Sequence, residues 1–209
     1  MDAHYLESLN ENGYCIIPNM LNPDEIFKAK ELFYEWYNSL ENIDFIHNKL
    51  NPHNIFKFHE VGHQEFAWYL RTRPQIIKTF ADLYKTDMDN LVTSFDGSCY
   101  YKPNTRLSDG LWTHTDISPK LSKEMKCYQG FISLSDNISN TLQVYEGSHN
   151  MHENYFRSKN QENDKKNWHK IDKSYLDNME DKRKILEIPA GSLVLWDSRT
   201  FHHNIIKNK

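Results

Sequence analysis

Cysteine is scarce in this chain, which has only three in 209 residues. Cys15, Cys99 and Cys127 lie far apart in the sequence and form no Cys-x-x-Cys motif. An odd number of widely spaced cysteines is not the pattern of a disulfide framework, and it indicates reduced thiols. We therefore expect a cytoplasmic protein.

Long apolar runs and an excess of positive charge are also missing. No apolar stretch approaches the roughly 20 residues that a transmembrane helix needs, and the polar, acidic start does not resemble a signal peptide. The chain has 25 Lys and Arg against 29 Asp and Glu, which gives a net charge of −4 and a pI near 6.2. These values predict no membrane contact and no nucleic-acid partner.

Aromatic residues are plentiful, at 13% of the chain, with twelve Tyr, eleven Phe and five Trp. The core is therefore expected to consist of large rings. A length of 209 residues fits a single domain, residues 1–209, that can bury a sizeable core.

The first part of the chain, residues 1–89, reads as helical. Residues 2–12 predict a short helix that ends at Gly13, followed by a short strand at 14–18. A longer helix begins at Asn22, where Pro23 occupies the first helical position and Glu25 completes a capping box. Another helix is expected at about 74–84, again with a proline at its start.

Short strands dominate the second part, residues 90–209. Regularly spaced short strands are typical of a sandwich or a jelly roll. Helices packed outside a double-stranded β-helix would fit both parts, which makes the expected fold mainly β with flanking helices. Three hairpin-like pairs are expected: 91–95 with 98–101 around Asp96-Gly97, 131–135 with 141–145, and 183–188 with 192–197.

A polar insertion interrupts the strands at about 150–182. Its charged centre, residues 160–167, is typical of a solvated excursion. The insertion also carries Tyr155, Phe156, Trp168 and Tyr175. These rings are expected either to pack on the wall of the barrel or to close over a substrate.

Three potential metal ligands are the most informative feature of the chain. His114 and Asp116 are two residues apart, so in an extended segment both point to the same face. His202 follows far downstream. Two imidazoles and one carboxylate suit a mononuclear Fe(II) centre, because this set leaves coordination positions open for other ligands.

Other histidines compete with this set. His47, His53, His59 and His63 form a second cluster, but no cysteine or His-Glu-x-x-His motif accompanies them, and we favour a structural or surface role. His203 is the main rival of its neighbour His202 for the third ligand position.

Several segments, in order along nearly the whole chain, resemble the phytanoyl-CoA dioxygenase family of Fe(II)/2-oxoglutarate oxygenases. The similarity covers residues 9–18 and 21–25, Tyr101-Lys102-Pro103, His114-Thr115-Asp116, 128–136, 142–149 and 190–199. One departure is Glu146, which stands where the family usually has a proline before Gly-Ser-His. His149 of that motif is not a ligand in the family.

The resemblance implies a double-stranded β-helix with the N-terminal helices packed outside. It implies that His114, Asp116 and His202 are catalytic and bind Fe(II), with 2-oxoglutarate as cosubstrate and dioxygen as oxidant. Gln129 and Asn204 match positions that help to hold the cosubstrate. The expected reaction is hydroxylation of a small-molecule substrate, since halogenation goes with loss of the carboxylate ligand.

Arginine is missing from one place where the family has it. The family's anchor for the far carboxylate of 2-oxoglutarate lies about ten residues after the distal histidine. Only seven residues follow His202 here. Besides His203, the basic residues among them are Lys207 and Lys209. Either the chain is truncated, with the C-terminal strand missing, or the anchor has moved. Arg199 is the first alternative, although a structural ion pair with Asp197 is favoured for it.

Two other function classes stay open on this sequence. A jelly-roll protein without catalysis could keep the fold and the metal but lack turnover of the cosubstrate. A protein that uses zinc or nickel at the same three residues is also consistent with the ligand set, because both ions bind more tightly than Fe(II).

Overall fold

The structure is a computed structural model that describes residues 1–43, 52–102 and 112–206. Its longer helices are α1 (Ala3–Asn12), α2 (Pro23–Ser39), α4 (Glu65–Arg71), α5 (Pro74–Tyr84), α6 (His152–Ser158) and α7 (Lys173–Asp177). Its strands are β1 (Tyr14–Ile17), β2 (Ile55–Phe56), β3 (Ser98–Cys99), β4 (His114–Thr115), β5 (Tyr128–Ile132), β6 (Asn140–Tyr145), β7 (His169–Lys170), β8 (Arg183–Ile185), β9 (Leu193–Asp197) and β10 (His202–Ile206). No described helix is long and apolar enough to cross a membrane.

The N-terminal helices begin and end where local sequence signals predict. Gly13 ends α1 with a φ of 84°, a left-handed conformation that glycine adopts without strain. At the start of α2, the side chain of Asn22 accepts from the Glu25 N–H, and the Glu25 carboxylate accepts from the Asn22 N–H. The capping box is confirmed.

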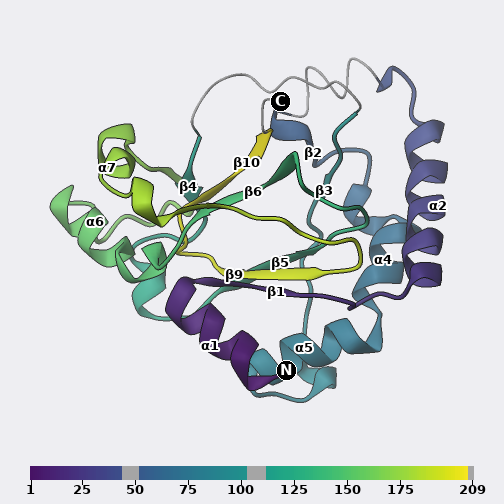
Figure 1. Ribbon diagram of the computed structural model, residues 1–209, viewed down its shortest axis with the longest axis horizontal. Helices are drawn as coiled ribbons and strands as arrows, with labels where there is room; N and C mark the ends of the chain where they lie inside the picture. The colour runs from purple at the N-terminus through teal and green to yellow at the C-terminus, as the bar shows by residue number, and fades with distance from the viewer. Residues whose placement is uncertain (44–51, 103–111, 207–209) are drawn as a thin grey trace.

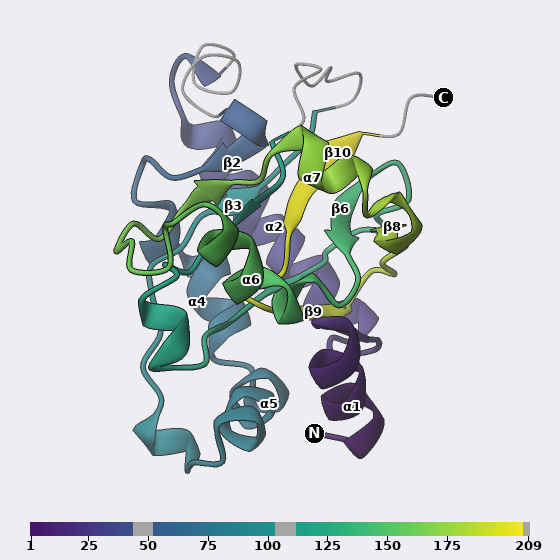
Figure 2. The same cartoon turned by 90° about the vertical axis from the view of Figure 1, so that its left-hand side faces the viewer.

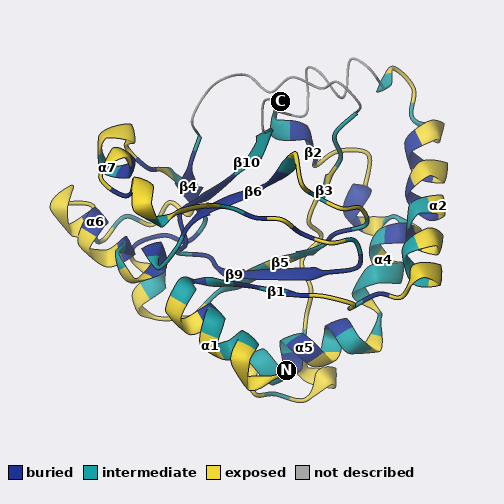
Figure 3. Ribbon diagram, in the orientation of Figure 1, coloured by how far each residue is buried: buried dark blue, intermediate teal, exposed yellow. Residues whose placement is uncertain are grey.

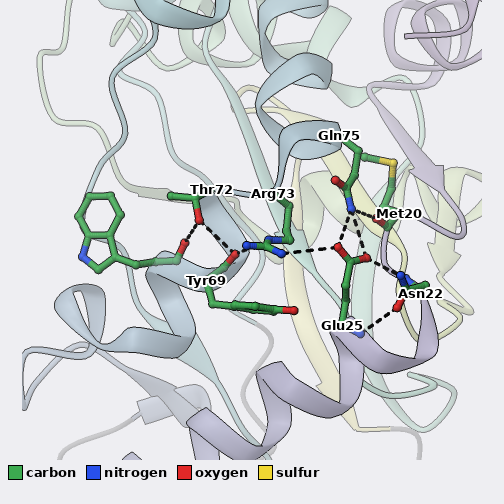
Figure 4. Close-up of polar contacts among 8 residues, drawn as sticks. Met20, Asn22, Glu25, Tyr69, Thr72, Arg73 and Gln75 are labelled. Atoms are coloured by element: carbon green, nitrogen blue, oxygen red, sulfur yellow. Dashed lines mark hydrogen bonds and ion pairs between the residues drawn. The ribbon is translucent and has the colours of Figure 1, made fainter.

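The same Glu25 carboxylate also ties α2 to α5 (Figure 4). Gln75 donates to it from the first turn of α5, at 3.2 Å, and the Arg73 guanidinium lies 3.8 Å away. Gln75 also donates to the Met20 carbonyl, at 2.9 Å. The starts of two helices are therefore joined through side chains about 50 residues apart in the sequence.

Two antiparallel sheets face each other (Figure 1). One has the strand order β1-β9-β5, and the other has the order β7-β4-β10-β6-β8. A buried apolar cluster with Leu142 and Val144 of β6 and Val194 and Trp196 of β9 fills the space between them. This is the double-stranded β-helix arrangement that was expected.

Helices cover the outside of the sheets, as Figures 1 and 2 show. Leu9 of α1 and Phe80 and Leu83 of α5 pack against Leu193 and Leu195, on the outer face of β9. In Figure 3 the helices carry exposed residues on their outer faces, whereas β9 is buried along its whole length. The expectation of N-terminal helices packed outside the β-core is confirmed.

The three strand pairings expected from the sequence are wrong. The sequence predicts that 131–135 pairs with 141–145, but in the structure β5 pairs with β9, and β6 pairs with β10 and β8. The segments 183–188 and 192–197 also separate, because β8 joins the five-stranded sheet and β9 the three-stranded one. Consecutive strands of this fold cross between the sheets, and local turn signals do not reveal that.

The expected hairpin at Asp96-Gly97 is also absent. Residues 91–97 form no strand, and β3 pairs with β2 instead. A Cβ atom at Gly97 would lie 2.2 Å from the Phe56 carbonyl oxygen. Glycine is therefore needed here for close approach of two backbones rather than for a tight turn.

The insertion at 150–182 folds as α6, β7 and α7 and packs on the barrel wall. Its residues Tyr155, Phe156 and Leu176 are buried against Tyr145 of β6 and Phe201. For Tyr155 and Phe156, packing on the barrel wall is therefore the alternative that the structure shows. Trp168, in contrast, is 41% exposed.

Candidate metal centre

The strand register brings two distant histidines together. β4 and β10 are antiparallel neighbours, and His114 lies directly opposite His202. Asp116 follows β4 immediately, and its backbone N–H donates to the Ser198 carbonyl at 3.0 Å, on the turn that precedes β10. Three residues spread over almost 90 positions of the chain therefore meet at one end of the five-stranded sheet.

Their donor atoms converge on one point. The Asp116 carboxylate lies 3.4 Å from Nε2 of His114 through Oδ1, and 3.3 Å from Nε2 of His202 through Oδ2. One ligand atom from each of the three residues lies within 4.8 Å of the others. Within the described residues, no other set of three histidine, cysteine or carboxylate side chains meets this condition.

Backbone carbonyls orient both imidazoles. Nδ1 of His114 lies 3.1 Å from the Trp112 carbonyl, and Nδ1 of His202 lies 2.8 Å from the Thr200 carbonyl. Because a carbonyl oxygen only accepts, each Nδ1 carries the hydrogen and each Nε2 has a free lone pair. Metal-binding histidines are held in this way by a hydrogen bond at the other ring nitrogen.

The protonation states also favour metal binding. Burial lowers the pKa of His114 below its ordinary value of 6.5. Burial alone would raise the pKa of Asp116, but hydrogen bonds and positive charge from His114 and His202 in their protonated forms outweigh it and hold the carboxyl pKa well below its usual range. At neutral pH, His114 therefore offers a neutral imidazole and Asp116 a carboxylate, which are the forms that bind a cation.

Gln129 supports the carboxylate from the opposite sheet. Its Nε2 atom donates to Oδ2 of Asp116 at 3.1 Å, while its Oε1 atom is buried and has no hydrogen-bond partner among the described residues. Trp196, the antiparallel partner of Gln129, likewise has a buried indole N–H without a partner, and its ring lies 5.2 Å from that of His202.

Unpaired buried polar atoms are rare in folded proteins and call for a partner. Gln129 and Trp196 place two of them beside Asp116 and His202. The residues present therefore fit a metal ion and, next to it, a ligand with polar oxygen atoms. The indole N–H donates, which suits a carboxylate or keto oxygen.

The other predicted cosubstrate residues lie in different surroundings. Asn204 is on β10, two residues after His202, and its side chain donates to Sγ of Cys99 at 3.4 Å. The Arg199 guanidinium is bound twice by the Asp197 carboxylate, at 2.8 and 2.6 Å. The structural ion pair favoured from the sequence is present. Lys207 and Lys209 lie outside the described residues.

The competing histidines do not reach the centre. His203 points to the other face of β10, where Nδ1 contacts Oγ1 of Thr113 at 2.8 Å. Nε2 of His149 lies 3.0 Å from the Asn10 carbonyl. His53 and His63 stack on aromatic rings, and His47 lies outside the described residues. Side chains alternate along a strand, which puts His203 on the face opposite His202.

Two aromatic rings contact His114, and neither contact was predicted from the sequence. Trp112 stacks on His114 with ring centroids 4.8 Å apart, and Trp168 stacks on it at 5.3 Å. Trp112 could have been found, because it precedes His114 by two positions in an extended segment and so shares its face. Trp168 lies 54 positions away, and no local pattern points to it.

With this geometry in place, comparison with known proteins decides the family. A model of the phytanoyl-CoA dioxygenase (PhyH) family matches residues 9–203. The chain belongs to the phytanoyl-CoA dioxygenase family. The match includes all three residues of the metal centre, and it confirms the resemblance seen in the sequence. The family's class is that of the non-haem iron and 2-oxoglutarate-dependent dioxygenases.

Individual relatives agree with this membership. The Ava biosynthesis cluster protein O of Aspergillus versicolor is 32% identical over 223 residues, which cover 95% of this chain and 70% of that protein. GlcNAc Inducible Gene 2 of Candida albicans has a similar fold, with a TM-score of 0.75 at 14% identity, and the match covers 100% of this chain and 60% of that one. HygX of Streptomyces hygroscopicus, solved with nickel and 2-oxoglutarate, has a TM-score of 0.57 at 13% identity, covering 100% and 82%.

Proposed function

We propose that this phytanoyl-CoA dioxygenase family protein hydroxylates a small molecule, with Fe(II) held by His114, Asp116 and His202. The observation that carries the proposal is the convergence of their three ligand atoms within 4.8 Å, with both Nε2 atoms left free by the carbonyl contacts at Nδ1. When bound, iron and 2-oxoglutarate together activate dioxygen, and C–H hydroxylation is coupled to oxidation of 2-oxoglutarate to succinate and CO2.

The protein's own residues keep the ligand set ready. Asp116 carries the negative charge that offsets the cation, and Gln129 holds its Oδ2 atom in place by a hydrogen bond at 3.1 Å. Because burial lowers the pKa of His114, its imidazole is neutral at neutral pH and needs no deprotonation to bind a metal ion. Three ligands on one side of an ion leave the remaining positions for cosubstrate and dioxygen.

We assign the cosubstrate to the side of the centre bounded by Gln129 and Trp196. The support is the unpaired indole N–H of Trp196, which can donate to an oxygen atom of 2-oxoglutarate. Asn204 is on the same strand face as His202, but its side chain donates to Cys99, so it supports the assignment less directly than Trp196 does. Arg199 is the weaker choice, because the Asp197 carboxylate already accepts hydrogen bonds from Nε and Nη2 of its guanidinium.

A small-molecule substrate is favoured by a structural relative. HygX has been solved with nickel, 2-oxoglutarate and hygromycin B bound. The net charge of −4 of this chain gives no reason to expect a nucleic-acid substrate.

All three cysteines are free thiols, which suits a reducing, cytoplasmic setting.

Succinate formation tests the proposal. Protein loaded anaerobically with Fe(II) and 2-oxoglutarate is exposed to dioxygen, and succinate is measured with and without candidate small molecules. We expect metal-dependent succinate from the wild type, and a loss of about 100-fold or more in His202→Gln, which lacks an imidazole ligand. The neighbouring His203→Gln variant is the matched control and should keep most of the activity.

Two outcomes would contradict the proposal. Tight metal binding without succinate would point to a non-catalytic binding protein. Equal activity in the two glutamine variants would show that His202 is not a ligand in turnover.

A further inference from the structure

Four rings form a continuous stack through the metal centre. The ring of His53 lies 3.6 Å from that of Trp112, with planes 10° apart, and Trp112 lies 4.8 Å from His114 at 19°. Trp168 follows at 5.3 Å from His114, with planes 29° apart. Trp112 and Trp168 make no ring contact with each other among the described residues, so each of them contacts the His114 imidazole separately.

Trp168 reaches this position because the insertion adds an edge strand beside the metal-binding strand. β7 pairs with β4, and Lys170 lies opposite His114. Residues 168 and 170 point to the same side of the sheet, since side chains alternate along a strand. Trp168 therefore shares a face with His114, although it is far away in the sequence.

The segment that carries Trp168 is fastened on both sides to the residues around the ligands. Before it, the side-chain oxygen of Asn167 accepts from the Ser118 N–H at 3.2 Å. After it, the Ile171 N–H donates to the Thr113 carbonyl at 2.8 Å. Ile171 is itself 1% exposed in the apolar cluster under the insertion. The indole is thus held against His114 by a packed, hydrogen-bonded frame.

The two partners differ sharply in exposure. His114 is 5% exposed, whereas Trp168 is 41% exposed. The indole therefore covers the ligand with part of its surface and presents the rest to solvent beside the metal centre. A large ring in this place restricts the rotation of the imidazole, whose plane is otherwise held by the contact of Nδ1 with the Trp112 carbonyl and that of Nε2 with Asp116.

We propose that Trp168 is a positioning residue for His114: the insertion stacks its indole on the imidazole and so fixes the plane of the ring whose Nε2 binds the metal. The inference rests on the proposed metal-binding role of His114. It assigns a purpose to the insertion that packing of Tyr155 and Phe156 does not explain.

Metal affinity of the full-length protein tests the positioning role without any knowledge of the substrate. Ni(II) is titrated calorimetrically into metal-free wild type, Trp168→Ala, Trp168→Phe and the control Trp68→Ala. Trp68 is a matched control because it is 38% exposed and lies on α4, where it contacts Phe95 and Arg71. We expect a two- to tenfold weaker Kd, roughly the worth of one aromatic stacking contact, in Trp168→Ala only, with most of the affinity restored by phenylalanine.

Tryptophan fluorescence gives a second, spectroscopic readout. Ni(II) quenches nearby indoles, and the chain has five tryptophans. Removing Trp168 should lower the fraction of emission that Ni(II) quenches, whereas removing Trp68 should raise it, because a distant, unquenched emitter is lost.

The outcomes separate this inference from the proposed function. A wild type that binds no Ni(II) would overturn both. Normal wild-type binding with an unchanged Kd in Trp168→Ala would overturn the positioning role alone. A weakened Kd that phenylalanine does not restore, in a variant with normal thermal unfolding, would also overturn it, because ring stacking would then not be the cause.

Discussion

The charge of Asp116 should decide metal binding while contributing little to the fold. The variant Asp116→Asn keeps the shape of the side chain, which is 25% exposed and fills no core volume. The hydrogen bond that it accepts from Gln129 changes from charge-assisted to neutral. The free energy of unfolding of the metal-free protein should therefore fall by only about 1 kcal/mol.

The effect on metal binding is much larger and can be converted into a melting temperature. Ni(II) at about 100 times the wild-type Kd stabilises the folded state by about 2.7 kcal/mol. For a domain of this size, each kcal/mol shifts Tm by roughly 2–4 °C, so the wild type should gain about 5–11 °C. If the variant binds about 100-fold more weakly, the same Ni(II) concentration contributes about 0.4 kcal/mol and raises Tm by about 1–2 °C.

Thermal unfolding with and without Ni(II) measures both quantities in one experiment. Asp177→Asn is the control, because Asp177 forms an exposed ion pair with Lys173 on α7. Its Ni(II)-induced shift should equal that of the wild type. A full shift in Asp116→Asn would refute the reasoning, since the metal would then not depend on the carboxylate.

Two further predictions concern the cosubstrate and pH. Trp196→Phe removes the unpaired indole N–H together with part of the ring, and it should weaken 2-oxoglutarate binding about tenfold at unchanged Ni(II) affinity. Arg199→Gln should bind 2-oxoglutarate normally. Calorimetry that finds the reverse would make Arg199 the anchor. Burial lowers the pKa of His152 from 6.5 to about 4. Between these two pH values His152 is protonated in the unfolded chain but neutral in the folded protein, so the free energy of unfolding falls as pH drops from about 6.5 toward 4. Between pH 7 and pH 5, the free energy of unfolding of the metal-free protein, measured with urea, should fall by about 2 kcal/mol less in His152→Leu than in the wild type. An equal pH dependence in the two proteins would contradict this.

The sequence alone determined what depends on near neighbours in the chain. Gly13 ends α1, Asn22 and Glu25 cap α2, and the spacing of His114 and Asp116 puts both on one face. These features follow from backbone geometry over two to four residues, which the local sequence specifies. The choice of His202 over His203 came instead from the family's spacing after residues 196–199, and alternation along the strand then turns His203 to the opposite face.

Only the tertiary structure decided which strands pair. Alternation and turn residues predict that β5, β6, β8 and β9 exist, but they carry no information on partners when successive strands cross between two sheets. For the same reason Trp168 could not be found from the sequence. Its contact with His114 depends on the pairing of β7 with β4, a long-range choice made by burial of the insertion's apolar residues against the barrel.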